Sequence, residues 1–369
     1  MRLVLLGHGC RIDSRQTLLL ANVEGTYESS IHELGWAARA MKAIYVRVPG
    51  GPEALEVVTL PTPQPGPGEV RVRAGAIGVG RPDVLIRTGA YKWMPPLPVI
   101  PGSEMAGAVD AIGPDVERLK VGQRVLISAR ELKQRANCYA EYIVVPEDAP
   151  FLLPPQIAPV DALSLPNLQL ANALLEEVPS HAKMMLLPGA AGGVASMLTQ
   201  LAHSRGIEVI GTASSPEKRS FASANGVSAF VDPGPSMPEQ VRDLTGGSGV
   251  DLAFDHLGAD SIVQCLRSLA PLGLLVSYNV IKGPPARDMF EEMRSLLGRS
   301  LTLRTFSMHT FDQVAETRRA LMHKAIEQLA SARVKAPSPQ IFGFHEIQRA
   351  HELLDAGAGI GKMVVIPDA

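Results

Sequence analysis

The sequence predicts an α/β protein in which a doubly wound parallel sheet is joined to a barrel-like β domain. Three observations support this prediction. The chain has 369 residues, which is too long for one ordinary hydrophobic core and indicates two domains. Between Met41 and about Val145, short apolar segments are separated by Gly and Pro. From about Leu165 onward, short apolar segments alternate with helix-length segments.

The first half of the chain is expected to form β-strands. Turn-forming residues such as Pro65-Gly66-Pro67-Gly68 and Pro101-Gly102 separate its apolar segments. Several short strands at this spacing are typical of a barrel-like domain. The expected strands are Lys42–Val48, Glu69–Val79, Met105–Ile112, Arg124–Ser128 and Tyr139–Val145.

The second half is expected to form a parallel sheet with helical crossovers. Ser215-Pro216 has the N-cap and first-turn residues of a helix that Gly226 ends, and Ser236 and Gly246 bound another. Six strands connected by five helices describe a doubly wound sheet. The expected strands are Met184–Leu187, Glu208–Gly211, Ala229–Val231, Leu252–Phe254, Leu274–Ser277 and Leu301–Phe306.

The C-terminal residues exceed what a six-stranded sheet needs. They predict a helix over about Asp312–Ala332, a strand at Gln340–Phe344, a helix at Glu346–Ala356 and a strand at Lys362–Ile366. We expect this tail to return to the β domain and to leave a ligand-binding cleft between the domains. The expected division is a poorly ordered extension over 1–40, a β domain over 41–164, an α/β domain over 165–307 and the return over 308–369.

Composition and charge exclude several classes of function. The formal net charge is −2, so neither nucleic acid nor an anionic membrane surface is expected as a partner. No apolar run approaches the roughly 18 residues that span a bilayer. The three cysteines, Cys10, Cys138 and Cys265, are far apart and lack metal-ligand spacing. They favour a reducing, cytoplasmic location over a disulfide framework.

The stretch over residues 184–195 is the most informative in the chain. An apolar strand runs through small residues into an apolar helix, with the pattern Gly189-x-x-Gly192-x-x-Ala195. Bare backbone N–H groups and the positive end of the helix dipole suit a diphosphate. Because this pattern stands at the start of a strand–helix alternation, it favours a dinucleotide site over a turn whose residues are small only for reasons of packing. The expected contacts are Gly189, Ala190, Ala191, Gly192, Gly193 and Val194.

The end of the second strand of this sheet favours NADP(H) over NAD(H). An enzyme that holds the free ribose hydroxyls of NAD usually has an acid there, but the segment Gly211-Thr212-Ala213 has none. Ser214, Ser215 and Lys218 could accept a 2′-phosphate, although Lys218 and Arg219 could also be ordinary solvated charges.

The loops after the fourth and fifth strands of the same sheet should also face the cofactor, because they follow carboxyl ends of parallel strands. The residues expected there are Gly258, Tyr278 and Asn279. His256 lies in the same loops, and we interpret it as a hydrogen-bonded structural residue rather than a catalytic base.

A series of motifs runs through the chain from Met41 to Pro367. They are Ala76-Ile77-Gly78, Asp83, Ile86-Arg87-x-Gly89-x-Tyr91, Pro101-Gly102-Ser103-Glu104-x-Ala106-Gly107, Val121-Gly122-Gln123-Arg124-Val125, Tyr139-Ala140-Glu141-Tyr142, Gly189–Ala195, Asp255-x-x-Gly258 and Gly361-Lys362. In their order and spacing, the chain resembles the medium-chain dehydrogenase/reductase superfamily, in its quinone oxidoreductase (zeta-crystallin-like) branch. The resemblance implies a GroES-like β domain, a Rossmann domain, a small-molecule substrate and a homo-oligomer, with a dimer expected.

The zinc ligands of the related alcohol dehydrogenases are missing. Ser103 stands where those enzymes place a ligand His, and no Cys lies near Gly80–Asp83. Their four-cysteine structural lobe would fall between Val125 and Tyr139, where only Cys138 is present. Since zinc needs three side-chain ligands of these types, we predict a zinc-independent protein.

Without a metal, the substrates that accept hydride most readily are quinones and α,β-unsaturated carbonyls. The resemblance places Tyr91 in the cleft, where its hydroxyl is the candidate catalytic donor; the alternative is a packing residue. Lys92 and Trp93 could border the pocket, and Phe306 and Met308 could form its apolar wall, although core packing explains these two equally well.

Two positions depart from the pattern of the branch. Gly80 stands where the branch commonly has Asn. Ala171 stands where the branch often has Thr, and Asn172 could take over the function of the missing hydroxyl. Two alternatives to a quinone or enone reductase therefore stay open. One is an enoyl-thioester reductase. The other is a catalytically weak NADPH-binding sensor or scaffold of the same fold.

Overall fold

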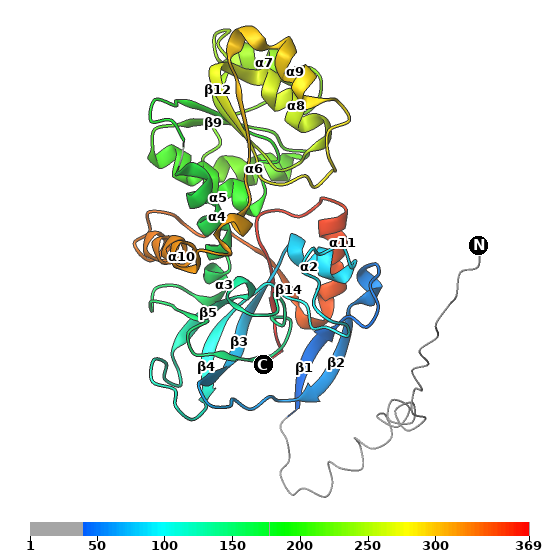
Figure 1. Ribbon diagram of the computed structural model, residues 1–369, viewed down its shortest axis with the longest axis vertical. Helices are drawn as coiled ribbons and strands as arrows, with labels where there is room; N and C mark the ends of the chain where they lie inside the picture. The colour runs from blue at the N-terminus through cyan, green and yellow to red at the C-terminus, as the bar shows by residue number, and fades with distance from the viewer. Residues whose placement is uncertain (1–39, 177, 369) are drawn as a thin grey trace, which may run out of the picture.

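The computed structural model describes residues 40–176 and 178–368. The extension predicted over residues 1–40 therefore lies outside the described residues, except for Ala40, which opens the first strand. Figure 1 shows two lobes, with helices α4 (Leu165–Leu175) and α10 (Ala315–Ala330) between them. The predicted pairing of a barrel-like β domain with a doubly wound parallel sheet is confirmed.

The β lobe is built on a sheet of seven strands with mostly antiparallel pairing. Its order is β14-β15-β3-β4-β5-β7, and β6 pairs with the other part of β3. A separate ribbon is formed by β1 (Ala40–Tyr45) and β2 (Glu56–Pro61). The strands of the sheet are β3 (Glu69–Val79), β4 (Glu104–Ile112), β5 (Arg124–Ser128), β6 (Tyr142–Pro146), β7 (Phe151–Leu152), β14 (Gln340–Gly343) and β15 (Met363–Ile366).

The other lobe is a parallel sheet of six strands in the order β10-β9-β8-β11-β12-β13. Both of its faces are covered, since Met185 and Leu187 of the central strand pack into one core while Leu186 packs into another. Burial on both faces explains why these strands are short apolar runs rather than alternating ones. The strands are β8 (Met184–Leu187), β9 (Glu208–Gly211), β10 (Ala229–Phe230), β11 (Val250–Asp255), β12 (Leu269–Ser277) and β13 (Thr302–Thr305).

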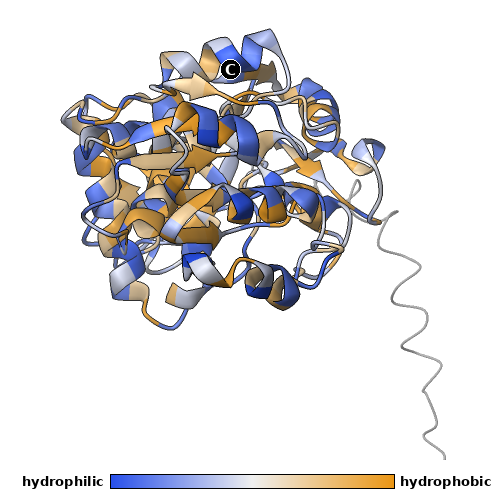
Figure 2. Cartoon of the chain, turned by 90° about the horizontal axis from the view of Figure 1, so that it is seen from above, coloured by the Kyte–Doolittle hydropathy of each residue, from blue (hydrophilic) through white to orange (hydrophobic). Residues whose placement is uncertain are grey.

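Five helices connect these strands, as predicted. They are α5 (Gly193–Ser204), α6 (Pro216–Ala224), α7 (Met237–Leu244), α8 (Ala259–Ser268) and α9 (Met289–Ser295). The view from above shows apolar residues gathered in the interior of the fold and polar residues on the outer helices (Figure 2). In the described part of the chain, no helix combines the length and the apolar character that crossing a membrane requires.

The C-terminal tail contacts both lobes. Met322, Ala325 and Ile326 of α10 share a core with α5 and β8. The same helix meets the β lobe, because Arg318 pairs with Glu131 and Arg319 lies over the Phe151 ring. Strand β14, helix α11 (Ile347–Asp355) and strand β15 then join the β lobe, where β15 pairs with β3. The division expected at residue 308 stays a prediction.

Three details of the β lobe differ from the sequence predictions. The exposed strand β2 and the two-residue strand β7 were not predicted. The strand expected from Tyr139 begins at Tyr142, because Tyr139 and Ala140 bond to β1 instead: the Tyr139 carbonyl accepts from Ile44, and Ala140 forms an isolated bridge with Ala43. Short helices α2 (Arg81–Arg87) and α3 (Pro159–Ala162) complete this lobe.

Candidate active site

The glycine-rich loop between β8 and α5 is fastened to the end of β9. Gly189 has a φ of +64°, a left-handed conformation that favours glycine. Its N–H donates to Thr212 Oγ1 at 3.0 Å, and the Ala190 N–H donates to the Thr212 carbonyl at 2.9 Å. Gly192 closes the turn by donating to the Gly189 carbonyl at 3.0 Å. These hydrogen bonds attach the loop to Thr212 and close its turn.

The N-terminus of α5 is left open by this loop. No side chain caps the helix at Gly192, whereas Ser215 caps α6 and Asp288 caps α9. The first-turn N–H groups of Gly193 and Val194 have no hydrogen-bond acceptor among the described residues. An uncapped helix N-terminus is a ready anion site, so the loop fits a diphosphate.

Side chains lie close to the glycines of this loop. A Cβ on Gly189 would be 2.8 Å from His256 Cε1, and one on Gly193 would be 2.5 Å from Asn167 Nδ2. The Gly361 N–H donates to the Ala191 carbonyl at 2.7 Å, which joins the loop to the chain entering β15. The motif Gly361-Lys362 thus reaches the site from the other lobe.

His256 is buried beside the loop and bonded to Tyr278, with 3.2 Å between its Nδ1 and the Tyr278 hydroxyl. Burial, with a smaller contribution from Lys282, lowers the pKa of His256 to about 4, so the imidazole is neutral at pH 7. Burial also raises the pKa of Tyr278. The structure is consistent with a structural His256, and its contact with Gly189 is a feature that the sequence did not indicate.

The two other residues predicted after β11 and β12 use their polar groups within their own loops. The Gly258 N–H donates to Asp255 Oδ2 at 2.8 Å, and Asn279 Oδ1 accepts from the Val280 N–H at 2.8 Å. Burial raises the pKa of Asp255. Contacts of Gly258, Tyr278 and Asn279 with a cofactor stay a prediction.

The end of β9 brings together the three residues predicted for a 2′-phosphate. Lys218 Nζ lies 3.2 Å from Ser214 Oγ and 2.6 Å from the Gly357 carbonyl of the opposite lobe. Ser215 Oγ accepts from the Lys218 N–H at 3.3 Å, which confirms Ser215 as the N-cap. Arg219 is directed elsewhere, because it forms an ion pair with Asp232 at 2.6 Å. Lys218 is therefore the cation that accompanies the two serines between the lobes.

The position of the alcohol dehydrogenase zinc site holds a buried polar cluster. Ser103 Oγ donates to Asp83 Oδ1 at 2.6 Å, and the Lys362 ammonium pairs with Glu104. Burial, reinforced by the charge of Glu104, raises the pKa of Asp83 to about 6. Across residues 40–176 and 178–368, no three His, Cys, Asp or Glu side chains form a group that could hold a metal ion. This donor set, with an ammonium beside its carboxylates, does not fit zinc.

Tyr91 lies in an aromatic cluster and packs in part against the core of the β lobe. Its ring meets Trp93 edge-on with 5.8 Å between centroids, and Trp93 stacks on His309 at 3.7 Å. Met308 is buried with Ala173 and Leu321, so it belongs to the core rather than to a pocket wall. Nothing in the sequence motifs singled out His309, which reaches Trp93 from a segment more than 200 residues away in the chain.

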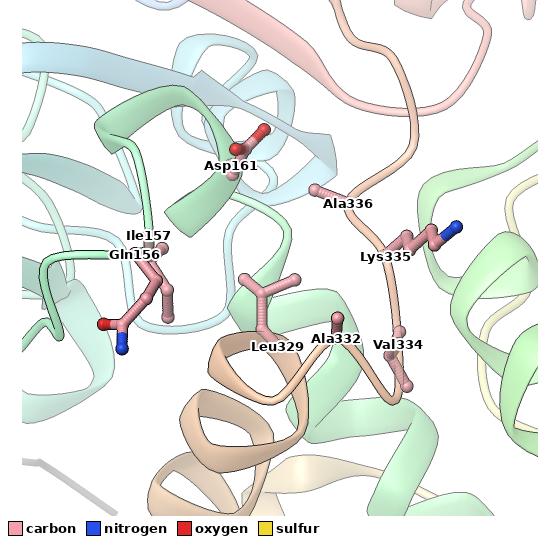
Figure 3. Close-up of a pocket in the computed structure, with 8 residues that line it drawn as sticks. All are labelled: Gln156, Ile157, Asp161, Leu329, Ala332, Val334, Lys335 and Ala336. Carbon is pink, nitrogen blue, oxygen red and sulfur yellow. The ribbon is translucent and has the colours of Figure 1, made fainter.

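Asn172 does not supply the hydroxyl that Ala171 lacks. Its amide is buried and exchanges two hydrogen bonds with Gln328 of α10, at 2.7 and 3.1 Å. A separate hollow of about 260 Å³ lies at the C-terminal end of α10, between Ile157, Leu329 and Val334 (Figure 3). None of the predicted site residues lines it, so the hollow is distinct from the predicted site.

A Rossmann-type sheet of this strand order, joined to a β lobe, is typical of two-domain dehydrogenases and reductases. Two family models match the chain accordingly. The alcohol dehydrogenase GroES-like domain matches residues 66–155, and the zinc-binding dehydrogenase model matches residues 193–325.

A quinone oxidoreductase from Pseudomonas aeruginosa is 32% identical over 330 residues, which cover 88% of this chain and 99% of that protein. A mycobacterial protein solved as an NADPH complex has a TM-score of 0.78 at 31% identity, covering 89% and 100% of the two chains. The Escherichia coli quinone oxidoreductase, also solved with NADPH, has a TM-score of 0.75 at 26% identity, covering 88% and 100%. This chain belongs to the quinone oxidoreductase branch of the medium-chain dehydrogenase/reductase superfamily, as its motifs predicted.

Proposed function

We propose that this protein is an NADPH-dependent, zinc-independent reductase of quinones or α,β-unsaturated carbonyls. The observation that carries the proposal is the open N-terminus of α5, together with Lys218 and Ser214 in contact after β9 and no acid at the end of that strand. The similar structures solved with NADPH support the same cofactor. The expected homodimer and cytoplasmic location follow from the resemblance and the composition alone.

When bound, NADPH supplies the hydride. The first-turn amides of α5 hold the diphosphate, and Lys218 balances the charge of the 2′-phosphate. The Tyr91 hydroxyl donates a hydrogen bond to the substrate oxygen that gains negative charge. Trp93 and His309 cover that end of the cleft, and solvent delivers the proton. The substrate gains two electrons and leaves as a hydroquinone or a saturated carbonyl.

One observation favours the non-catalytic alternative. Asn172 is fully engaged with Gln328, so the hydroxyl lost at Ala171 has no substitute from that side chain. A chain that binds NADPH tightly but does not oxidise it with any of the acceptors would be a sensor or scaffold of the same fold.

The test is to follow NADPH oxidation with quinones, enones and an enoyl thioester as acceptors. For the preferred acceptor, we expect Tyr91→Phe to lower kcat/KM by about tenfold, the effect of losing one hydrogen bond to a developing charge. Tyr45→Phe, at the end of β1, is the matched control and should change nothing. A rate unaltered in Tyr91→Phe would remove Tyr91 from this role. Tight NADPH binding without oxidation by any acceptor would contradict the proposed enzyme.

A further inference from the structure

Three distant segments meet around Trp93 and form a cationic and aromatic cluster. We call it the Arg130 cluster; it consists of Tyr91, Trp93, Arg130, Arg135, His309 and Asp312. Arg130 and Arg135 lie in the segment between β5 and β6, where the related alcohol dehydrogenases have their four-cysteine lobe. His309 and Asp312 follow β13, the last strand of the parallel sheet.

The order of the strands places the cluster on the nicotinamide side of the proposed cofactor site. In a doubly wound sheet, each half of the sheet binds one mononucleotide of a dinucleotide. Lys218 follows β9, in the half that takes the adenosine. His309 follows β13, in the half that takes the nicotinamide. A side chain bonded to His309 therefore lies nearer to the reacting end than to the 2′-phosphate.

The aromatic part of the cluster is the Trp93 ring, which stacks on His309 and has Lys92 Nζ 5.1 Å from its centroid. Trp93 and His309 stack with 29° between their planes, and Trp93 keeps 37% of its surface exposed. The guanidinium of Arg135 lies 4.9 Å from the Trp93 ring centroid. Burial and the neighbouring arginines lower the pKa of His309. At pH 7 the imidazole is accordingly neutral and does not add to the positive charge.

The two arginines of the cluster differ in how closely a carboxylate approaches their guanidinium groups. Arg135 is 2.8 Å from Asp312 Oδ2 and 2.8 Å from His309 Nδ1. Arg130 is 3.4 Å from His309 Nδ1, and its one ion pair within the described residues is with Asp312 Oδ1, at 4.0 Å. That distance leaves Oδ1 without a hydrogen-bond partner among the described residues.

The carboxylate next to Arg130 in the chain does not neutralise it either. Glu131 is occupied by Arg318 at 2.7 Å and by Arg319 at 3.1 Å. Burial lowers the pKa of Arg130, while an electrostatic interaction with Tyr91 opposes this. A guanidinium stays charged in proteins, so the cluster holds a half-buried cation, beside Tyr91, that no close carboxylate balances.

We propose that Arg130 binds an anionic group of the substrate. The preferred acceptor is then a planar quinone or enone that carries a carboxylate or sulfonate, with its ring against Trp93 and its reducible carbonyl at Tyr91. This inference rests on the proposed function, because it names the substrate class of the same site. A charge-assisted hydrogen bond to a partly buried arginine supplies both affinity and orientation.

The test compares 1,4-naphthoquinone with 1,4-naphthoquinone-2-sulfonate in the wild type, in Arg130→Gln and in Arg333→Gln. Arg333 pairs with Glu327 on an exposed surface and is the matched control. For the wild type we expect a higher kcat/KM with the sulfonate. Arg130→Gln should lower that value by about tenfold, through a raised KM, and should affect the neutral quinone far less. Arg333→Gln should leave both values unchanged.

The other outcomes separate this inference from the proposed function. Equal losses with both quinones, or no preference in the wild type, would overturn the role of Arg130 while leaving a quinone reductase. A raised KM for NADPH in Arg130→Gln would assign the arginine to the cofactor and also overturn it. If neither quinone is reduced, calorimetric titration of the sulfonate into the NADP⁺-loaded protein still decides. No binding in the wild type, or equal binding in Arg130→Gln, would contradict the inference.

Discussion

The two parts of the proposed site are built in different ways. The residues proposed for the nucleotide come mainly from one stretch, from β8 through α5 and β9 into α6, with the Gly189 N–H bonded to Thr212 Oγ1. The other lobe adds the backbone of Gly361, which bonds to Ala191. The residues proposed for the substrate come from three segments, with Arg130 and His309 separated by 179 positions in the chain. The first part is shaped mainly by backbone groups, and the second depends on side chains from both lobes.

This difference explains which types of residue each part of the proposed site requires. At the nucleotide end, glycines matter because backbone must approach the ligand and because His256 and Asn167 lie against the loop. At the substrate end, long side chains matter, and the chemistry can change whenever a loop changes. On the proposed assignment, the nucleotide-binding loop is the part shared by the family, and the residues proposed for the substrate are the part that would determine the acceptor.

The largest expected effect is on NADPH affinity and comes from a substitution in the proposed nucleotide-binding loop alone. A Cβ on Gly192 would meet the Gly189 carbonyl oxygen at 3.4 Å and nothing nearer, so Gly192→Ala should fold normally. The added methyl would hold the diphosphate away from the amides and weaken NADPH binding by about 100-fold, or about 2.7 kcal/mol. Calorimetry and a thermal melt measure the two effects. Gly298→Ala, with nothing within 4 Å of its Cβ, is the control. Undiminished NADPH affinity in Gly192→Ala would show that the diphosphate lies elsewhere.

The next effect concerns the support beneath the loop. The pKa of His256 is about 4 in the folded protein, below its ordinary value of 6.5. As the pH falls, His256 is therefore protonated in the unfolded chain before it is protonated in the folded protein. The stability that the neutral His256 contributes is fully present above pH 6.5 and is lost as the pH falls toward 4. Between pH 7 and pH 5, the wild type should lose about 2 kcal/mol more than His256→Asn, as measured by chemical denaturation. The raised pKa of Asp83 acts in the opposite direction but is common to both proteins. Parallel pH profiles would mean that His256 is not buried as described.

The smallest effect sharpens the choice of cofactor. Lys218→Ala should weaken NADPH binding by about tenfold and leave NADH binding nearly unchanged, because NADH lacks the 2′-phosphate. Its neighbour Arg219, which is paired with Asp232, provides a control of equal charge. Equal weakening of both cofactors by Lys218→Ala, or an equal effect of Arg219→Ala, would remove the specific contact.

Most of the fold could be predicted from the sequence, because buried parallel strands and helix caps leave local signals. The bounds of β3, β5, β8 and β9 agree with those expected. The strand β2 was missed because most of its residues are exposed and its apolar residues form no buried run. The position of α10 between the lobes was not expected, because its contacts with α4 and with Glu131 join residues far apart in the chain.

The proposed site differs in the same way between its two parts. The loop at Gly189–Val194 and the group Ser214, Ser215 and Lys218 were proposed from motifs that follow predicted strands, and the structure brings the two serines and Lys218 together. Arg130 could not be proposed in this way. Its proposed role depends on its contact with His309, and on the ion pair of Glu131 with Arg318, which leaves Glu131 unable to balance Arg130. The available signal was the arginine-containing segment that stands in place of the cysteine lobe.

The central claim is that α5 and Lys218 together hold NADPH by its diphosphate and its 2′-phosphate. Crystals of the protein grown with NADPH test it most directly. We expect the diphosphate oxygens within hydrogen-bond distance of the Gly193 and Val194 amides, and the 2′-phosphate on Lys218 and Ser214. A cofactor whose diphosphate lies away from this loop, or whose 2′-phosphate contacts neither residue, would contradict the account.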